Sequence, residues 1–538
     1  MKIRRFAGFA ATVAVGALAL TSCSSSGSTG GEATTDGAGG IVTAWGSEPQ
    51  NPLIPTNTNE VGGGKIIDLI FSGLVYYDAD GAPHNEVAES IETDDAQTYT
   101  ITLEEGWTFS NGEPVTSESF VDAWNYGAKL SNAQLSSYFF EMIEGFSWDE
   151  DSELTGLQIV DDTTFTVTLK QPEADFPLRL GYSAYFPLPQ AAFEDMDAFG
   201  EHPIGNGPYK VASDDAWQHN VEIALVPNED YTDERVPQNG GVTIKFYETV
   251  DGAYNDLLAG QLDVLDQVPD SAFSTVENEL GDRAINQPAA LNQTLTIPMD
   301  LEHFSGEEGV LRRQAISMAI NREEITDAIF EGTRTPARDF TSPVIDGWSD
   351  DVAGVEVLEF NPEKARELWA EADAISPYTG TFTIGYNSDG GHQAWVDAVT
   401  NSLRNTLGIS AEGNPYPAFK DLRADVTAGT ISGAFRSGWQ ADYPSLYNFL
   451  GPIFGTGAGS NDAGYSSPEV DSLLAQGSAA SSVDEANEYF TQVQEVLLQD
   501  LPQIPLWYQN VTGGSADTVS NVEFGWNGVP LLYEVTKG

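Results

Sequence analysis

The stretch RSGWQADYPSLYNFL, residues 436–450, places one arginine and one aspartate among tryptophan, tyrosine and phenylalanine. A carboxylate held among aromatic side chains is partly desolvated, which is unfavourable unless a cation pairs with it. Two cations could pair with Asp442: the guanidinium of Arg436, or an ammonium group brought by a ligand. From these residues alone, an internal ion pair and a ligand-binding carboxylate are equally open.

Motifs for covalent catalysis or metal binding are scarce elsewhere in the chain. The stretch GGGKI at 62–66 lacks the upstream glycine and the Ser or Thr of a phosphate-binding loop, so it predicts a flexible turn. There is no G-x-S-x-G, H-E-x-x-H or cysteine pair, and the five histidines are scattered without ligand spacing. Paired carboxylates carry no information in a chain with so many acids. We therefore predict no catalytic residue, no metal site and no cofactor.

The elements that position Asp442 are predicted from periodicity. TFTIGY at 381–386 and ISGAF at 431–435 predict strands, and Trp395, Val399, Leu403 and Leu407 share one face of a helix between them. Strand, helix and strand at this spacing describe an α/β lobe with crossover connections. Ligands of such lobes bind beyond the carboxyl ends of strands, and Arg436 and Asp442 follow the second strand.

Cap residues mark the beginnings of two other helices. Asn321 with Glu324 forms a capping-box pattern that starts a helix, which Gly332 can end. Asn361 and Pro362 suit the N-cap and the first position of the next helix. Alternating polar and apolar residues also predict half-buried strands at 98–103 and 164–169.

Composition limits the class of protein. The chain has 538 residues, with 23 Lys and Arg against 82 Asp and Glu, and a formal net charge of -59. That length predicts two or three lobes with sizeable cores. The acidity argues against nucleic acid as a partner and against electrostatic docking on an anionic membrane.

The first residues resemble a bacterial lipoprotein signal. A basic start is followed by an apolar run that is short for a membrane span, and Leu20-Thr21-Ser22-Cys23 resembles a lipobox. Cys23 is the single cysteine of the chain and precedes a Gly, Ser and Thr-rich stretch. We predict a signal peptide at 1–22, a lipid anchor on Cys23, a flexible tether at 23–40 and a location on the outer face of the cell membrane.

Further segments match signatures of a known protein family and occur in the same order along the chain. They are EPQNPLIP with IIDLIFSGLVYYDADGAPHNEVAES, YTITLEEGWTFSNGEPVTSESFVDAWNYG, IGNGPYKV, RRQAISMAINREEI and LPQIPLWYQN. YTITLEEGWTFSNGEPVTSESFVDAWNYG is similar to a W-x-F-S-x-G-x-P-[LV]-T signature, and GWQADYPSLYNFL is similar to a W-x-A-D-Y segment. Together they resemble the oligopeptide and dipeptide solute-binding proteins of ABC importers, also called solute-binding family 5. Asn206 and Asn321 stand where this family usually has threonine and aspartate.

The resemblance implies a fold and a domain organisation. The fold is an α/β periplasmic-binding-protein-like fold of the cluster C type, with two lobes joined by a hinge and an extra N-terminal lobe. Lobe I is discontinuous, comprising residues 41–76, 201–297 and 505–538. The extra lobe II comprises residues 77–200, and lobe III comprises residues 298–504.

The resemblance also implies the site residues. Asp442 matches the aspartate that holds the α-amino group of bound peptides, and Arg436 matches an arginine that can meet the carboxylate of a short peptide. The remaining predicted ligand-binding residues are Trp439, Gln440, Ala441 and Tyr443 beside Asp442, Phe419 where relatives often have tryptophan, and Glu60, Val61 and Tyr138 from looser matches.

The function implied is capture of short peptides and their delivery to the permease and ATPase subunits of an ABC importer, by a monomer that is not an enzyme. Gln440 and the residues after Tyr443 depart from the commonest peptide-binder sequence. Two alternatives therefore stay open: the same fold binding another solute such as an oligosaccharide, and a tethered secreted hydrolase.

Overall fold

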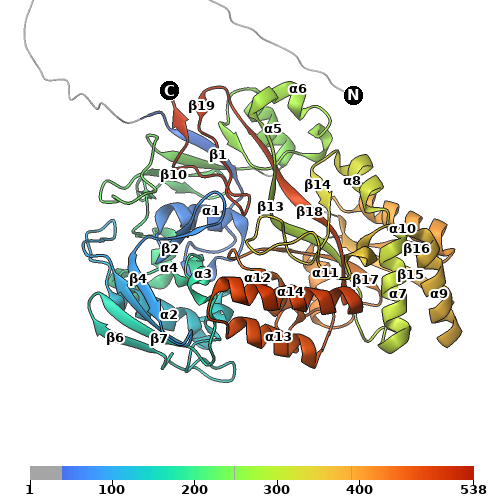
Figure 1. Cartoon of the computed structure of the whole chain (residues 1–538). Helices are drawn as coiled ribbons and strands as arrows, with labels where there is room; N and C mark the ends of the chain where they lie inside the picture. The colour runs from blue at the N-terminus through green and yellow to red at the C-terminus, as the bar shows by residue number, and fades with distance from the viewer. Residues whose placement is uncertain (1–38, 248, 389–390, 418) are drawn as a thin grey trace, which may run out of the picture. The chain divides into compact units, whose positions relative to one another are not determined.

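A 12-stranded mixed sheet and a four-stranded antiparallel sheet organise the fold (Figure 1). The computed structural model describes residues 39–247, 249–388, 391–417 and 419–538. The predicted signal peptide, Cys23 and most of the predicted tether lie outside these described residues. Residues 39–538 form one unit, and Gly40 N donates to Lys537 O (2.9 Å), so the two ends of this unit lie side by side.

Two long strands at the centre of the large sheet join its two halves. These are β13 (Ala284–Thr296) and β18 (Gln503–Ser515), which pair antiparallel with a register shift between Pro288 and Asn292. Outward from β13 lie β17 (Ala434–Gln440), β15 (Thr381–Asn387) and β16 (Ser410–Tyr416). Outward from β18 lie β12 (Val264–Leu265), β1 (Val42–Gly46), β11 (Val242–Phe246), β10 (Glu222–Pro227) and β8 (Tyr209–Val211). Two short strands lie off this order: β14 (Arg334–Pro336) pairs with β18, and β9 (Trp217–Gln218) pairs with β10.

The predicted crossover between β15 and β17 is confirmed, since the two strands run parallel, but an unpredicted strand, β16, and helix α11 (Phe419–Thr427) lie between the predicted helix and β17. β15 and β16 run parallel and are joined by α10 (Gln393–Leu407), which ends at Gly408 in a left-handed conformation (φ 71°). Trp395, Val399 and Leu403 are buried on one face of α10, as the periodicity predicts, whereas Leu407 is half-buried.

The small sheet contains both of the other predicted strands. Its order is β4 (Ala88–Thr93), β5 (Thr98–Leu103), β7 (Thr164–Thr168) and β6 (Leu157–Asp161). β5 and β7 are direct antiparallel neighbours whose apolar residues point into the core. Separate two-stranded pairs are formed by β2 (Val75–Tyr77) with β3 (Pro83–Asn85) and by β19 (Val519–Ser520) with β20 (Thr536–Lys537).

The predicted helix caps are confirmed. The Asn321 side chain accepts from Glu324 N (3.3 Å) at the start of α8, and Asn361 accepts from Lys364 N (3.1 Å) at the start of α9. The helices besides α10 are α1 (Val61–Ile70), α2 (Ser117–Ala128), α3 (Phe176–Arg179), α4 (Met196–Glu201), α5 (Val250–Leu258), α6 (Val276–Leu280), α7 (Gly306–Ala319), α8 (Arg322–Phe330), α9 (Pro362–Ile375), α11 (Phe419–Thr427), α12 (Leu446–Phe454), α13 (Pro468–Ser478) and α14 (Val483–Asp500). Among the described residues, no helix combines the length and the apolar character needed to cross a membrane.

Two local predictions are wrong. The stretch 62–66 is not a flexible turn but the first part of α1, because the Glu60 carboxylate accepts from Gly62 N (2.7 Å) and Gly63 N (2.9 Å) and so caps the helix. The predicted strand at 431–435 begins only at Ala434 and continues to Gln440. Antiparallel pairing of its residues 435–440 with β13 extends it, so Arg436 lies within the strand and not after it.

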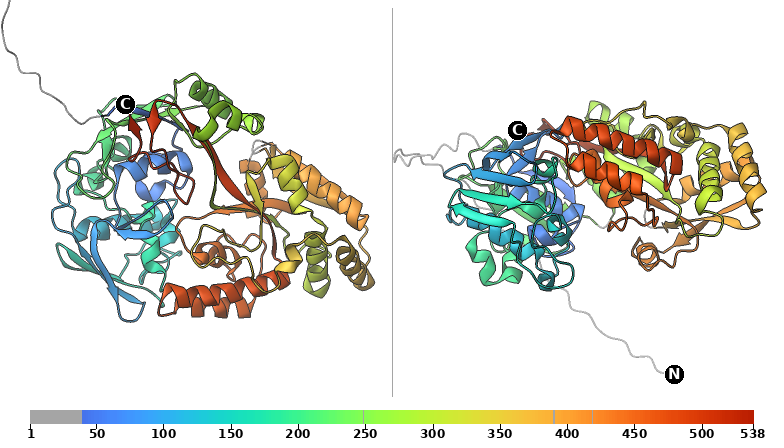
Figure 2. Two further views of the ribbon diagram at one scale, coloured as in Figure 1. Left: turned by 45° about the horizontal axis from the view of Figure 1, so that its top comes forward. Right: turned by 60° about the horizontal axis from the view of Figure 1, so that its bottom comes forward.

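Two large hydrophobic cores lie on either side of the central strands. One gathers buried side chains mostly from residues 42–264, and the other mostly from residues 290–507. Figure 2 shows the two corresponding parts, coloured blue to cyan and yellow to orange, on opposite sides in both views. The division into lobes I, II and III with the predicted boundaries stays a prediction.

Candidate ligand-binding site

A cavity of about 600 Å³ lies where residues of the two cores face each other. Its walls come from α1, β2, residues 181–186, the end of β17 and the loop at 525–533. A volume of this size is typical of sites for small organic ligands. A second cavity of about 220 Å³ shares Phe419, Gly438 and Trp439 with the first, so the two adjoin each other beside β17.

Most of the predicted site residues meet at the larger cavity. Its lining includes Glu60, Val61, Phe419, Trp439, Gln440, Ala441 and Asp442. Arg436 lines the smaller cavity instead. Tyr443 and Tyr138 line neither of the two cavities. The Tyr443 ring is buried beneath the Arg179 guanidinium, and Tyr138 is 39% exposed, with its ring 4.5 Å from that of Phe139.

Asn448, on α12, fixes the position of Asp442. Its amide nitrogen donates to Asp442 Oδ2 (3.1 Å), and its amide oxygen accepts from Asp442 N (3.0 Å) and Trp439 Nε1 (2.9 Å). Burial raises the pKa of Asp442 to about 6, and the hydrogen bond from Asn448 offsets only part of that effect. The carboxylate is therefore oriented but only weakly stabilised in its charged form.

Arg436 is directed away from Asp442. Its Nε donates to Asn387 Oδ1 (2.7 Å), and the guanidinium carbon lies 4.7 Å from the centroid of the Phe419 ring. Among the described residues, no lysine or arginine forms an ion pair with Asp442, whose carboxylate is bonded only to Asn448. Of the two cations that the sequence leaves open for Asp442, the internal one is not used.

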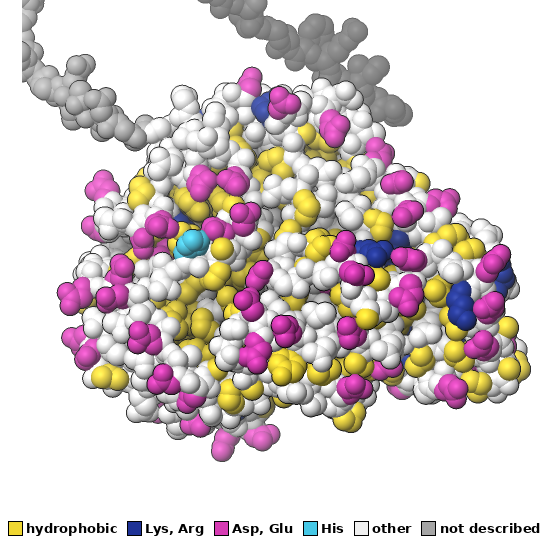
Figure 3. All heavy atoms as spheres, viewed as in Figure 1, with side chains coloured by type: hydrophobic (Ala, Val, Ile, Leu, Met, Phe, Trp, Pro, Cys, Tyr) yellow, Lys and Arg dark blue, Asp and Glu magenta, His cyan; other side chains and the backbone are white. Residues whose placement is uncertain are grey.

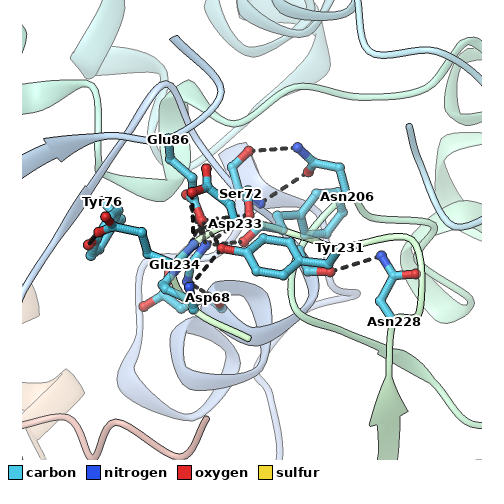
Figure 4. A network of polar contacts seen from close by, with 12 residues as sticks. Asp68, Ser72, Tyr76, Glu86, Asn206, Asn228, Tyr231, Asp233 and Glu234 are labelled. Atoms are coloured by element: carbon cyan, nitrogen blue, oxygen red, sulfur yellow. Dashed lines mark hydrogen bonds and ion pairs between the residues drawn. The ribbon is translucent and has the colours of Figure 1, made fainter. Parts of the chain in front are cut away.

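The opposite wall of the cavity is a fixed polar network (Figure 4). The Arg235 guanidinium pairs with Glu86 (2.7 Å) and donates to the backbone oxygen of Asp68 (2.9 Å). Glu86 also accepts from Tyr231 Oη (2.8 Å) and Ser72 Oγ (3.0 Å). Burial raises the pKa of Glu86, although Arg235 and these donors oppose the shift.

Several lining residues were missed by sequence reasoning. Lys65 and Asp68 lie on the face of α1 that begins at Val61, at helical spacings of four and three. That spacing would have found them if residues 62–66 had been assigned to a helix. The aromatic lining has no such signal, because it is brought together from separate segments: Tyr76, Tyr77, Tyr182, Trp526 and Tyr533.

The arrangement of acidic side chains bears on whether the protein has a metal site. Figure 3 shows Asp and Glu side chains scattered over the whole face in view, with few Lys or Arg. In the parts of the chain that the structure describes, no cluster of three or more His, Cys, Asp or Glu could hold a metal ion. On the face shown, the acidic side chains are thus spread out and not gathered into one patch.

Comparisons with known proteins agree on one family. The model for bacterial extracellular solute-binding proteins, family 5 (Middle) matches residues 82–461. The oligopeptide-binding protein OppA of Bacillus subtilis (strain 168) is 24% identical over 492 residues, covering 86% of each chain. The periplasmic oligopeptide-binding protein OppA of Salmonella typhimurium is 27% identical over 481 residues, again covering 86% of each chain.

Solved structures share the fold. The crystal structure of Haemophilus influenzae OppA in complex with RPPGFSPFR superposes with a TM-score of 0.74, at 23% identity, over 93% of this chain and 99% of that one. The Escherichia coli murein tripeptide binding protein MppA gives a TM-score of 0.77 at 21% identity, over 93% and 98% of the two chains. The fold is therefore of the periplasmic-binding-protein type, as predicted. Since the family model spans more than half of the sequence, the chain belongs to the bacterial extracellular solute-binding proteins of family 5.

Proposed function

We propose that this protein captures short peptides outside the cell and delivers them to the permease of an ABC importer, whose ATPase subunits supply the energy. The observation that carries the proposal is Asp442, a part-buried carboxylate in the wall of a cavity of about 600 Å³, oriented by Asn448 and without an internal cation. A peptide's α-amino group is the cation that this carboxylate suits. The relatives named as oligopeptide-binding proteins support the same ligand class.

The backbone of β17 suits an extended peptide. β15 pairs only with Ala434 and Phe435, so along the rest of β17 no strand among the described residues covers that edge. A peptide can add to such an edge as a further strand, with Trp439, Gln440 and Ala441 beside its first residues. In this arrangement the smaller cavity receives the following residues, where Arg436 and Phe419 can meet a carboxylate or a side chain.

The remaining predicted residues surround the proposed peptide position or support the residues that contact the peptide. Glu60 and Val61 form the opposing wall at the start of α1, which would approach the peptide when the two halves close around it. Tyr443 supports Asp442 from within the core, and Tyr138 flanks the site through Phe139, whose ring stacks on that of Tyr182 (4.4 Å).

Removing the charge of Asp442 tests the proposal. Asp442→Asn keeps the shape of the side chain and its bond with Asn448, but it should weaken binding of free tripeptides by about 2 to 5 kcal/mol, as loss of one partner of a buried charge pair does. N-acetylation of the peptides should weaken binding to the natural protein similarly. Isothermal titration calorimetry measures both effects.

The exposed aspartate at the turn of the small sheet offers a matched control. Asp94→Asn removes one negative charge from an exposed residue that lines neither cavity and should leave peptide affinity unchanged. Equal affinity of the Asp442→Asn variant and the natural protein for free peptides would refute the role of Asp442. Indifference to acetylation would refute recognition of the amino terminus.

The aromatic lining favours one second candidate. Tyrosine and tryptophan rings on several walls of the cavity suit stacking against sugar rings as well as peptide side chains. Oligosaccharides therefore form the second ligand panel for the same calorimetry. Binding of sugars in place of peptides would assign Asp442 a structural role.

The protein is further proposed to act as a lipid-anchored monomer without catalytic turnover, held at the outer face of the membrane through Cys23. The lipobox-like sequence and the Gly, Ser and Thr-rich stretch after it support this. Mass spectrometry of the mature amino terminus checks the acylation, since an unmodified Cys23 or an uncleaved leader would contradict it.

A further inference from the structure

The larger cavity carries more negative than positive charge. Among the described lining residues, the carboxylates are Glu60, Asp68, Asp78, Glu86 and Asp442, and the cations are Lys65 and Arg235. A ligand that fills the cavity displaces water from these groups, so each one needs a partner in the bound state. The partners that the protein itself provides therefore indicate what the ligand must bring.

Three of the carboxylates and both cations already have partners. Arg235 pairs with Glu86, and Lys65 pairs with Asp266, which lies outside the lining. Asp78 binds His84 (2.9 Å) and the backbone of its own turn. Glu60 caps α1 with both of its oxygens. Of the other two, Asp442 has only the neutral amide of Asn448 as a side-chain partner, and Asp68 remains.

The Asp68 carboxylate has no hydrogen-bond or ion-pair partner among the described residues. The nearby Arg235 uses its guanidinium for Glu86, Ser72 and main-chain oxygens, including that of Asp68 (Figure 4). Burial raises the pKa of Asp68 to about 6, with Arg235 lowering it and Glu86 adding to the rise. Asp68 thus lies near the guanidinium of Arg235, but that guanidinium is already paired with Glu86.

Asp68 and Asp442 belong to one electrostatic environment. Burial raises the pKa of both Tyr77 and Tyr182, and the charges of Asp68 and Asp442 add to the rise for each of them. Both carboxylates line the same cavity as these two phenols, one from α1 and the other from the loop directly after β17. A ligand of a few residues can contact both.

We propose that Asp68 is a specificity-determining residue that holds a second positive charge of the ligand, so that the preferred ligands are short peptides with lysine or arginine at the first or second position. The inference rests on the proposed function, in which Asp442 holds the α-amino group. A neutral side chain near Asp68 would desolvate the carboxylate without compensation, whereas an ammonium or guanidinium group supplies the missing partner.

A matched peptide pair tests the inference without any variant. Lys-Ala-Ala and Ala-Lys-Ala are compared with the same peptides carrying norleucine, which keeps most of the aliphatic chain and lacks the charge. At least one lysine peptide should bind the natural protein about tenfold more tightly or better than its norleucine partner. Equal affinities within both pairs would overturn the role of Asp68 and leave peptide capture standing.

The Asp68→Asn variant assigns the effect to this residue. It should abolish the preference for lysine by weakening binding of the lysine peptides, while the norleucine peptides should bind at least as tightly as to the natural protein, because no carboxylate is left to desolvate. The exposed-site variant Asp94→Asn should keep the preference. A lysine preference that survives Asp68→Asn would overturn the inference. If none of the four peptides binds the natural protein, the proposed function fails, and the inference fails with it.

Discussion

The ionised form of Asp442 is the form that can hold an ammonium group, so its pKa governs how affinity depends on pH. Besides Asn448, the groups that interact with Asp442 are the phenols of Tyr77, Tyr138 and Tyr182. Burial raises the pKa of each phenol, so all three stay neutral below pH 9. The proton that binds Asp442 near pH 6 therefore competes directly with the peptide.

We expect peptide affinity to be greatest near neutral pH and to fall as pH drops through about 6, approaching tenfold per pH unit for one competing proton. At higher pH the affinity should fall again, because the peptide's own α-amino group, with an ordinary pKa of about 8, loses its proton. Lysine peptides should show a steeper fall, because Asp68 titrates in the same range. Calorimetry at pH 7.5, 6 and 5 (about one unit either side of that pKa) measures this dependence. The same affinity at all three would contradict a charge-based role for Asp442.

The ligand-free protein should respond to pH with the opposite sign. The pKa of Asp442 is raised above its ordinary value of 3.8, so the folded state disfavours the ionised form, and this penalty is present above pH 6 and relieved as pH falls. Asp442→Asn lacks the penalty. The variant should therefore be more stable than the natural protein at neutral pH, by a margin that shrinks toward pH 5 in urea unfolding. A margin that is constant or grows would exclude burial as the cause of the shift.

Helix α1 depends on a single carboxylate at its start. Glu60 accepts from Gly62 N and Gly63 N, and the three glycines that follow Val61 have low helix propensity. We expect Glu60→Ala to lower the free energy of unfolding by about 1 kcal/mol, the usual effect of losing an N-cap. Because α1 carries Asp68, the same change should also weaken binding of lysine peptides.

The exposed glutamate on β4 provides the comparison for this prediction. Glu92→Ala removes a carboxylate of the same type from a solvent-facing position and should alter stability by less than about 0.5 kcal/mol. Equal stabilities of the two variants in urea unfolding would mean that Glu60 contributes nothing as a cap.

The sequence predicts elements whose signals are local. Asn321 and Asn361 mark helix starts because a cap needs only its own first turn. The end of β17 could not be predicted, since pairing with the distant β13 carries the strand on to Gln440. The helix at 62–66 was missed because glycine is typical of turns, and only the Glu60 carboxylate reverses that preference.

The residues of the site also divide into those with a local sequence signal and those without one. Asp442 is apparent from its aromatic neighbours and from the family motif, both of which are sequence features. Its partner Asn448 is only six positions away, but its orientation depends on where α12 begins. The pairing of Arg235 with Glu86 joins residues 149 apart in the chain, so no local pattern reveals it or the resulting isolation of Asp68.

At the scale of the whole molecule, a buried ion cluster connects the region before α3 to the segment that follows Asp442. Arg179 pairs with Glu173 (2.5 Å) and Asp175 (3.1 Å), and its guanidinium lies over the rings of Tyr443 (5.3 Å) and Tyr447 (5.2 Å). Tyr443 belongs to the first large core, whereas its neighbour Ala441 belongs to the second. The cluster therefore holds the two cores together beside the site.

Replacing Arg179 should be among the most damaging single changes. Arg179→Met leaves two buried carboxylates without a cation and should lower the free energy of unfolding by about 3 to 5 kcal/mol. Arg338→Met breaks an exposed pair with Glu359 and should cost less than about 1 kcal/mol. Urea unfolding distinguishes the two, and similar losses for both would show that the cluster around Arg179 does not stabilise the fold.

The place of β18 in the large sheet determines when the chain can finish folding. β18 is nearly the last strand in sequence, yet it lies between β13 and β12 and is hydrogen-bonded to both. Until residues 503–515 have been synthesised, β12 and β13 each present an unpaired edge, and the sheet is divided into two unconnected parts. Such edges favour association with other chains, so a nascent chain of this protein is vulnerable to aggregation until translation is nearly complete.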